Sequence, residues 1–193
     1  MNRLARGLAL LAVALAALLA PPLAQAQQKL LPAQSEISFV SRQMRSPVEG
    51  RFRSFDAQVV LDPKQLAAAK IVFTVDLASA TLGSTETETE LRQPDWFDVK
   101  KFPQATFTSS AVKPVGPRRL EVVGTFSLKG RSRPLSVPVA LTQAGGTTTA
   151  TGAFTIRRLD FKVGDGDWTD TDLIANDVQV KFKLALSGVA ALW

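Results

Sequence analysis

Apolar and polar residues alternate with a period of two along most of this chain, and this pattern constrains its fold more than any other feature. Successive side chains of a β-strand point to opposite faces of a sheet, so the alternation predicts strands with one buried face. The pattern recurs over residues 37–39, 48–52, 55–59, 71–77, 105–108, 120–126, 135–141, 153–156 and 178–184. We interpret a phase slip near Ser54 as a bulge within one strand, which leaves about eight strands.

Turn-forming residues separate these stretches, and only two short segments are expected to be helical. Residues 65–70 are rich in alanine and about one turn long, and residues 84–93 carry acidic side chains where they favour a helix N-terminus. Pro138 cannot donate a hydrogen bond to a neighbouring strand, so we expect it at a sheet edge or a bulge. Many short strands with few helices predict an all-β barrel or sandwich.

A barrel of about eight strands encloses a lumen that either fills with side chains or holds one elongated ligand. We expect Trp96 and Trp168 to close such a lumen. The inward phase of the alternation selects the other candidate lumen residues, which are Phe52, Phe73, Phe107, Val122, Phe126, Val139, Phe154, Val180 and Phe182. An ordinary packed core would explain the same set, so the pattern alone leaves both interpretations open.

Three residue types are absent, and their absence excludes most catalytic sites. The chain has no cysteine, no histidine and no tyrosine. Without cysteine there are no thiol nucleophiles, disulfides or thiolate metal sites, and without histidine the commonest general base near neutral pH is missing. We therefore expect a binding protein without cofactor, and not an enzyme.

Two acidic stretches are expected to be solvent-exposed rather than functional. Asp165, Asp167, Asp170 and Asp172 lie in one glycine-containing loop, but their spacing is not that of a calcium-binding loop, so no metal site is predicted. The run Glu86, Glu88 and Glu90 spaces its charges by two, and we expect that these three side chains do not share one helix face.

The N-terminal segment 1–26 is expected to be a cleaved signal peptide. Arg3 and Arg6 precede an apolar run over Leu8–Ala20, and Ala24-Gln25-Ala26 gives the small-x-small pattern of a cleavage site. An uncleaved membrane anchor is the alternative, and this cleavage pattern argues against it. Residues 27–193 would then form one exported domain of mildly positive charge, for which nucleic acid is not an expected partner.

One long motif covers residues 95–107. It reads Asp95-Trp96-Phe97-Asp98-Val99-Lys100-Lys101-Phe102-Pro103-Gln104-Ala105-Thr106-Phe107. This motif resembles the D-x-F-D-x-x-x-[YF]-P-x-A-x-F signature of the YceI-like family. Weaker matches follow the same order along the chain, at residues 48–55, 124–135, 158–161 and 178–180. Together they extend from about Leu30 to Ser187, which is nearly the whole expected domain. The first motif is long and specific.

The resemblance implies an extended, lipocalin-like antiparallel barrel in the periplasm, with a long isoprenoid-type lipid (a quinone or a polyprenyl derivative) in its lumen. Arg42, Arg53 and Arg158 are candidates for holding a phosphate or polar head, and the alternative, which we favour, is that these basic residues are dispersed surface charge. Relatives often have histidine where Gln34 and Gln43 stand here, so ligand contacts of those histidines do not carry over, and we favour a neutral head.

The alternative from another class is an accessory protein with a filled barrel that binds a membrane partner such as a b-type cytochrome. Transient contact with the membrane or with such a cytochrome is compatible with either interpretation. The chain is expected to be a monomer or a homodimer.

Overall fold

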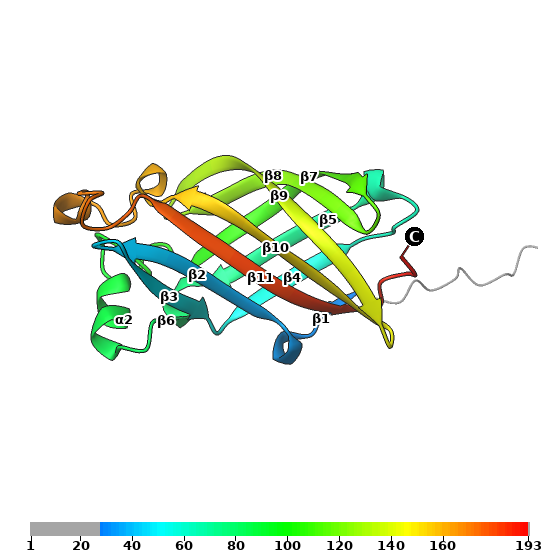
Figure 1. The fold of residues 1–193 in the computed structure, drawn as a ribbon, viewed down its shortest axis with the longest axis horizontal. Coiled ribbons are helices and arrows are strands. Elements are labelled where there is room, and N and C mark those ends of the chain that lie inside the picture. The colour runs from blue at the N-terminus through cyan, green and yellow to red at the C-terminus, as the bar shows by residue number, and fades with distance from the viewer. Residues whose placement is uncertain (1–27, 193) are drawn as a thin grey trace, which may run out of the picture.

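The computed structural model describes residues 28–192, and its main element is one antiparallel sheet that curls along its length (Figure 1). The strands are β1 (Lys29–Leu30), β2 (Glu36–Gln43), β3 (Ser46–Phe52), β4 (Phe55–Val60), β5 (Lys70–Asp76), β6 (Ala80–Thr81), β7 (Gln104–Gly116), β8 (Arg119–Leu128), β9 (Arg131–Ala144), β10 (Thr147–Arg157) and β11 (Asp177–Ser187). The helices are α2 (Thr85–Leu91) and the 3-10 turns η2 (Pro32–Gln34), η3 (Leu66–Ala68), η4 (Leu77–Ser79), η5 (Arg158–Phe161) and η6 (Gly166–Trp168). The predicted signal peptide, residues 1–26, lies outside the described residues.

The sheet curls into an elongated, barrel-like shell, which confirms the expected lipocalin-like fold. Its strands follow the order β4-β5-β7-β8-β9-β10-β11-β2-β3-β6, and β1 pairs with β11 off this path. Residues beside β1 and β4 connect the two sides, because the Gln28 side-chain amide exchanges two hydrogen bonds of 2.8 Å with the main chain of Leu61. The 11 strands exceed the expected number partly because β1 and β6 contain only two residues each.

The expected bulge near Ser54 is wrong, because the chain changes its position in the sheet there. β3 ends at Phe52 and pairs with β2 and β6, whereas β4 begins at Phe55 and pairs with β5. Ser54 bonds outside both strands: its carbonyl accepts the Asp76 amide and its own amide donates to the Ser79 hydroxyl. The phase slip thus marks the break between two strands at opposite ends of the sheet order.

The two predicted helical segments and the edge position of Pro138 are confirmed. Residues 66–68 form a single 3-10 turn, and α2 begins after Ser84, whose hydroxyl accepts the Thr87 amide. β9 pairs with β10 only from Val139 onward, so Pro138 belongs to the part of β9 that has only β8 beside it.

Two glycines on the inner wall leave room for aromatic rings to lie against the sheet. Gly50 stands opposite Phe39 in the β2–β3 pair, and Gly152 stands opposite Phe182 in the β10–β11 pair. A Cβ at either glycine would collide with the opposing ring. Because each ring lies over its glycine, it extends less far into the interior of the barrel than it would over a larger residue.

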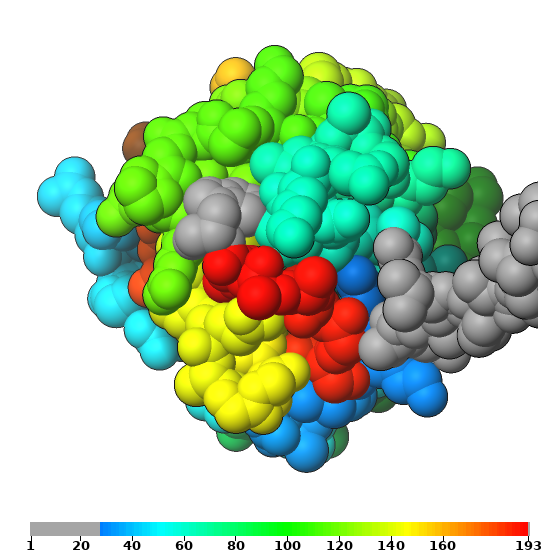
Figure 2. All heavy atoms as spheres, turned by 90° about the vertical axis from the view of Figure 1, so that its right-hand side faces the viewer, coloured from blue at the N-terminus to red at the C-terminus, as the bar shows by residue number. Residues whose placement is uncertain are grey.

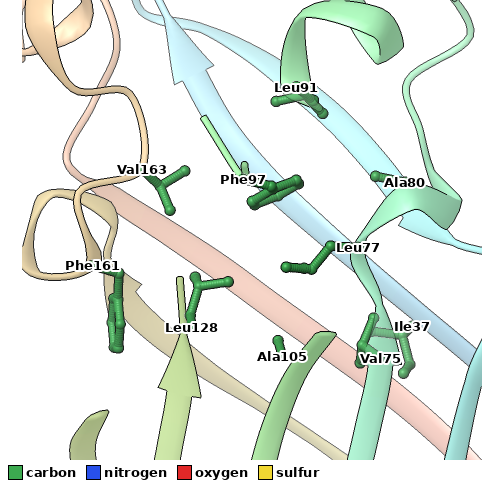
Figure 3. Close-up of a cluster of buried hydrophobic side chains, with 10 residues drawn as sticks. All are labelled: Ile37, Val75, Leu77, Ala80, Leu91, Phe97, Ala105, Leu128, Phe161 and Val163. Carbon is green, nitrogen blue, oxygen red and sulfur yellow. The ribbon is translucent and has the colours of Figure 1, made fainter. Parts of the chain in front are cut away.

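The two ends of the shell differ in how they are covered. At one end the residues after β11, the β9–β10 turn and η3 pack side by side (Figure 2), with Gln143 donating to the carbonyls of Val189 and Ala190. We call this the closed end. The other end is formed by α2, the β2–β3 turn and the loops that contain η5 and η6 (Figure 1). We call it the α2 end. Figure 3 shows Leu91, Phe97, Phe161 and Val163 directed into the interior there.

Candidate functional site

A cavity of about 630 Å³ occupies the interior of the barrel and is lined mainly by apolar side chains. This volume lies within the ~300–1,000 Å³ typical of small-molecule pockets. The cavity extends along both buried clusters, the one near α2 and the one near the closed end. Its polar lining residues are Ser41, Gln43, Glu86, Thr87, Glu90, Thr106 and Arg158.

The cavity opens at the α2 end. Of its lining residues at that end, Gln43, Glu86, Glu90 and Trp168 are exposed to solvent. At the other end the lining includes residues that are almost fully buried, among them Leu61, Leu120, Leu141 and Leu186. An apolar chain would therefore enter past α2 and point its tail toward the closed end.

Every residue predicted for the lumen lies in the wall of this cavity. These residues are Phe52, Phe73, Trp96, Phe107, Val122, Phe126, Val139, Phe154, Val180 and Phe182. Phe107 and Phe126 stand opposite each other on β7 and β8, and the Phe126 ring packs edge-on against Phe154 and Phe161. Their contact with a ligand stays a prediction.

The three candidate headgroup arginines do not come together. Arg42 lies on β2 between Ser41 and Gln43, which line the cavity, so its own exposed side chain belongs to the opposite face of the strand. Arg53 is exposed and donates to the Thr81 hydroxyl, outside the cavity lining. Of the three, only Arg158 reaches the cavity wall.

Arg158 has no donor left for a headgroup. Its side chain is only 2% exposed, and all five N–H groups of its guanidinium donate to main-chain carbonyls at 2.7–3.1 Å. The acceptors belong to Val163, Gly164, Trp168, Ile174 and Ala175. Burial lowers the pKa of Arg158. The geometry thus assigns Arg158 the role of fixing the η5–η6 loops beside the cavity.

As expected, Glu86, Glu88 and Glu90 do not all share one helix face, but two of them do. Glu86 and Glu90 are four residues apart on α2, so they lie on one face, and both line the cavity. Glu88 faces elsewhere: its carboxylate accepts hydrogen bonds from the Thr81 hydroxyl and the Leu82 amide. Glu88 thereby joins α2 to β6, while its two neighbours face the opening.

The hydrogen bonds to Glu88 give a testable pH dependence. The Thr81 hydroxyl and then the Leu82 amide lower the pKa of the Glu88 carboxyl below its ordinary value. A lowered pKa means that this contact stabilises the folded state above about pH 4.3, the ordinary glutamate pKa, and that the contribution is lost as the pH falls through the lowered pKa. In a carboxyl-detected NMR titration, Thr81→Val should raise the Glu88 midpoint. An unchanged midpoint in this variant would contradict the assigned contact.

Trp96 and Trp168 pack together at the α2 end, with ring centroids 5.6 Å apart. They come from loops far apart in sequence, which the amides of Gly164 and Asp165 join by donating to the Asp95 carbonyl. Both indoles line the cavity. The Trp96 Nε1 atom is buried and has no hydrogen-bond partner within residues 28–192.

The aspartate-rich loop offers no metal site within the described chain. Asp165 pairs with Lys162 at 3.6 Å, and Asp170 accepts the Asp172 amide. Over residues 28–192, no group of three or more acidic side chains is arranged to hold a metal ion. In the same range, no helix combines the length and apolarity needed to cross a bilayer.

Several residues of the cavity wall were not among the lumen residues predicted from the sequence. Ile37, Phe39, Ala57, Val59 and Leu61 continue the inward phase of strands already predicted, so the alternation could have identified them. Glu86 and Glu90 could have been found from their four-residue spacing. Of the two glutamines that replace histidine, Gln43 lines the cavity, whereas Gln34 lies in η2 outside it.

The chain is similar to known sequences over most of the barrel. A family model described as YceI-like domain matches residues 29–186. A UPF0312 protein of Vibrio cholerae is 34% identical over 100 residues, which are 52% of this chain and 53% of that protein. The YceI protein of Escherichia coli is 35% identical over 96 residues, half of each chain. The match thus spans about half the length of these curated relatives.

Solved structures extend the similarity to the complete barrel. The crystal structure of Burkholderia cenocepacia BcnA is 42% identical, with a TM-score of 0.78, over 81% of this chain and 98% of that one. A polyisoprenoid binding domain from Saccharophagus degradans is 18% identical, with a TM-score of 0.69, over 83% of this chain and 98% of that one. At this identity, the second comparison shows a shared fold alone.

Proposed function

Since the chain belongs to the YceI-like domain family, we propose that it is an exported carrier that holds one long apolar lipid of isoprenoid type inside its barrel. The observation that supports this most directly is the apolar cavity, which opens at the α2 end and is closed at the other. Burying an apolar chain there would be favourable by roughly 0.8 kcal/mol per methylene before the costs of binding.

Two further observations support this function over the alternatives. A filled barrel, as the accessory-protein interpretation requires, does not fit an interior with about 630 Å³ of free space. A fold neighbour of this chain is described as a polyisoprenoid binding domain. The expected signal sequence at residues 1–26 would place the carrier in the periplasm, where an isoprenoid chain has negligible solubility.

A displacement assay tests the proposed function. The protein, stripped of lipid with organic solvent and refolded, is loaded with a polarity-sensitive fluorophore and titrated with the isoprenoid alcohol geranylgeraniol. We expect saturable displacement at one site per chain. If the fluorophore binds but the alcohol never displaces it, the proposed ligand class is wrong.

We also propose that the carrier loads at a bilayer surface with its α2 end facing the lipid. Met44 and Leu173 are 67% and 50% exposed, and the Met44 amide donates to the Leu173 carbonyl beside the opening. Their neighbours Gln43 and Ile174 line the cavity. An exposed apolar rim at the opening would let a lipid pass from the bilayer without crossing water.

The exposed apolar rim formed by Met44 and Leu173 predicts the rate at which the protein takes up lipid from a bilayer. Met44→Ser/Leu173→Ser should slow uptake of geranylgeraniol from phosphatidylcholine vesicles by about tenfold, because partial burial of two apolar side chains is lost. The matched control is Val60→Ser/Val115→Ser, since these residues are 56% and 59% exposed near the closed end. Equal uptake rates in both double variants would contradict loading through the α2 end.

A further inference from the structure

The charged side chains of the cavity wall indicate which charge is favourable for the head of the ligand. Within the described residues, three ionisable side chains line the cavity: Glu86, Glu90 and Arg158. Arg158 is held by its five main-chain carbonyls, which leaves it no free donor. Glu86 and Glu90 have no hydrogen-bond or ion-pair partner for their carboxylates within residues 28–192. The charge available to a ligand at the opening is therefore negative.

The position of these carboxylates is fixed by the rest of α2. Glu88, on another face of the helix, is bonded to Thr81 and Leu82, and Leu91 is buried in the core below (Figure 3). Glu86 and Glu90 are thus directed at the opening by the anchoring of the helix. They lie where the head of a bound lipid would emerge, because the opposite end of the cavity is closed.

Within the described residues, the basic side chains at this end other than Arg158 lie outside the cavity lining. Arg45, in the β2–β3 turn, and Arg92, after α2, lie at the same end, but neither lines the cavity. Arg92 donates instead to the Ala78 carbonyl. The indole of Trp168 is part of the opening, and the face of an indole attracts cations.

We propose that the cavity selects its ligand by the charge of the head, preferring a cationic amphiphile over a neutral one and disfavouring an anionic one. The ligand class is an apolar chain that ends in an amine or a quaternary ammonium. This inference rests on the proposed function, since the same cavity must hold the apolar chain. A phosphate or carboxylate head would face two unpaired carboxylates, and the one arginine of the described cavity wall has no free donor for it.

Three ligands that share one chain and differ in head charge test this selectivity. Hexadecylamine, hexadecanol and hexadecanoate are titrated separately at neutral pH, each below its aggregation concentration, against the fluorophore-loaded protein. We expect the amine to bind about fivefold more tightly than the alcohol and the carboxylate about fivefold more weakly, because exposed charge pairs are individually weak. Both differences should shrink at high salt.

A double variant and its matched control assign the effect to α2. Glu86→Gln/Glu90→Gln should bring the three affinities together and leave that of the alcohol unchanged. Glu36→Gln/Glu49→Gln removes the same charge from exposed positions on β2 and β3 that lie outside the cavity lining, and it should keep the wild-type order. Hexadecanol binding without charge discrimination, or discrimination that survives in the α2 variant, would overturn this inference and leave the lipid-binding proposal intact. Failure of hexadecanol itself to bind would overturn both.

Discussion

Phe126→Glu is expected to weaken lipid binding at least about 100-fold. The Phe126 ring lies in the cavity wall, packed edge-on against Phe154 at 6.2 Å and Phe161 at 5.3 Å between centroids. A carboxylate there would replace an aromatic ring in an apolar wall, and burying a charge beside an apolar chain costs several kcal/mol. Geranylgeraniol affinity, measured by fluorophore displacement, is the readout.

The adjacent residue offers a close control for this substitution. Thr125 is exposed on the same strand, so Thr125→Glu adds the same charge to the outer face and should leave affinity unchanged. Phe107→Glu tests the facing position on β7 and should act like Phe126→Glu. Circular dichroism identifies the variants that remain folded. Wild-type affinity in both folded lumen variants would place the lipid outside the barrel.

Arg158→Met is expected to lower the melting temperature by roughly 10 °C. The substitution leaves five buried or half-buried carbonyls without their donor, and breaking a buried charged network of this kind costs about 3–5 kcal/mol. For a chain of this size, each kcal/mol corresponds to about 2–4 °C. Thermal unfolding followed by circular dichroism measures the change.

Two companion variants separate the hydrogen bonds from the loss of charge. Arg157→Met removes the same charge from an exposed neighbour and should change the melting temperature little. Arg158→Lys keeps the charge but supplies three donors for five acceptors, so it should fall between wild type and Arg158→Met. Equal stability of the Arg157 and Arg158 variants would show that the guanidinium does not hold the η5–η6 loops.

The wall of the cavity could be predicted from the sequence because it depends on local periodicity. Each strand exposes alternate residues to the interior, so the positions of Phe73, Phe107 and Phe182 follow from the alternation alone. The helix after Ser84 was likewise predictable from local capping chemistry. The long motif after α2 identified the family, which the match over residues 29–186 confirms.

The features that could not be predicted from the sequence depend on contacts between segments far apart in the chain. Nothing near Ser54 indicates that β3 and β4 separate to opposite ends of the sheet order, because that break is fixed by their partners β6 and β5. Arg158 looks like a surface cation until residues 163–175 fold back and surround its guanidinium with carbonyls. Whether the aromatic side chains fill the barrel or line a cavity depends on how far they reach inward, which spacing does not encode.

Native mass spectrometry of the purified protein, followed by solvent extraction, tests the central claim most directly. The account predicts one bound molecule per chain in excess of the polypeptide mass, extractable into organic solvent and dominated by hydrocarbon. The extracted protein should then rebind a long-chain lipid at one site. A bare polypeptide mass, together with no saturable binding of any long-chain amphiphile to the folded protein, would contradict the assignment of this chain as a lipid carrier.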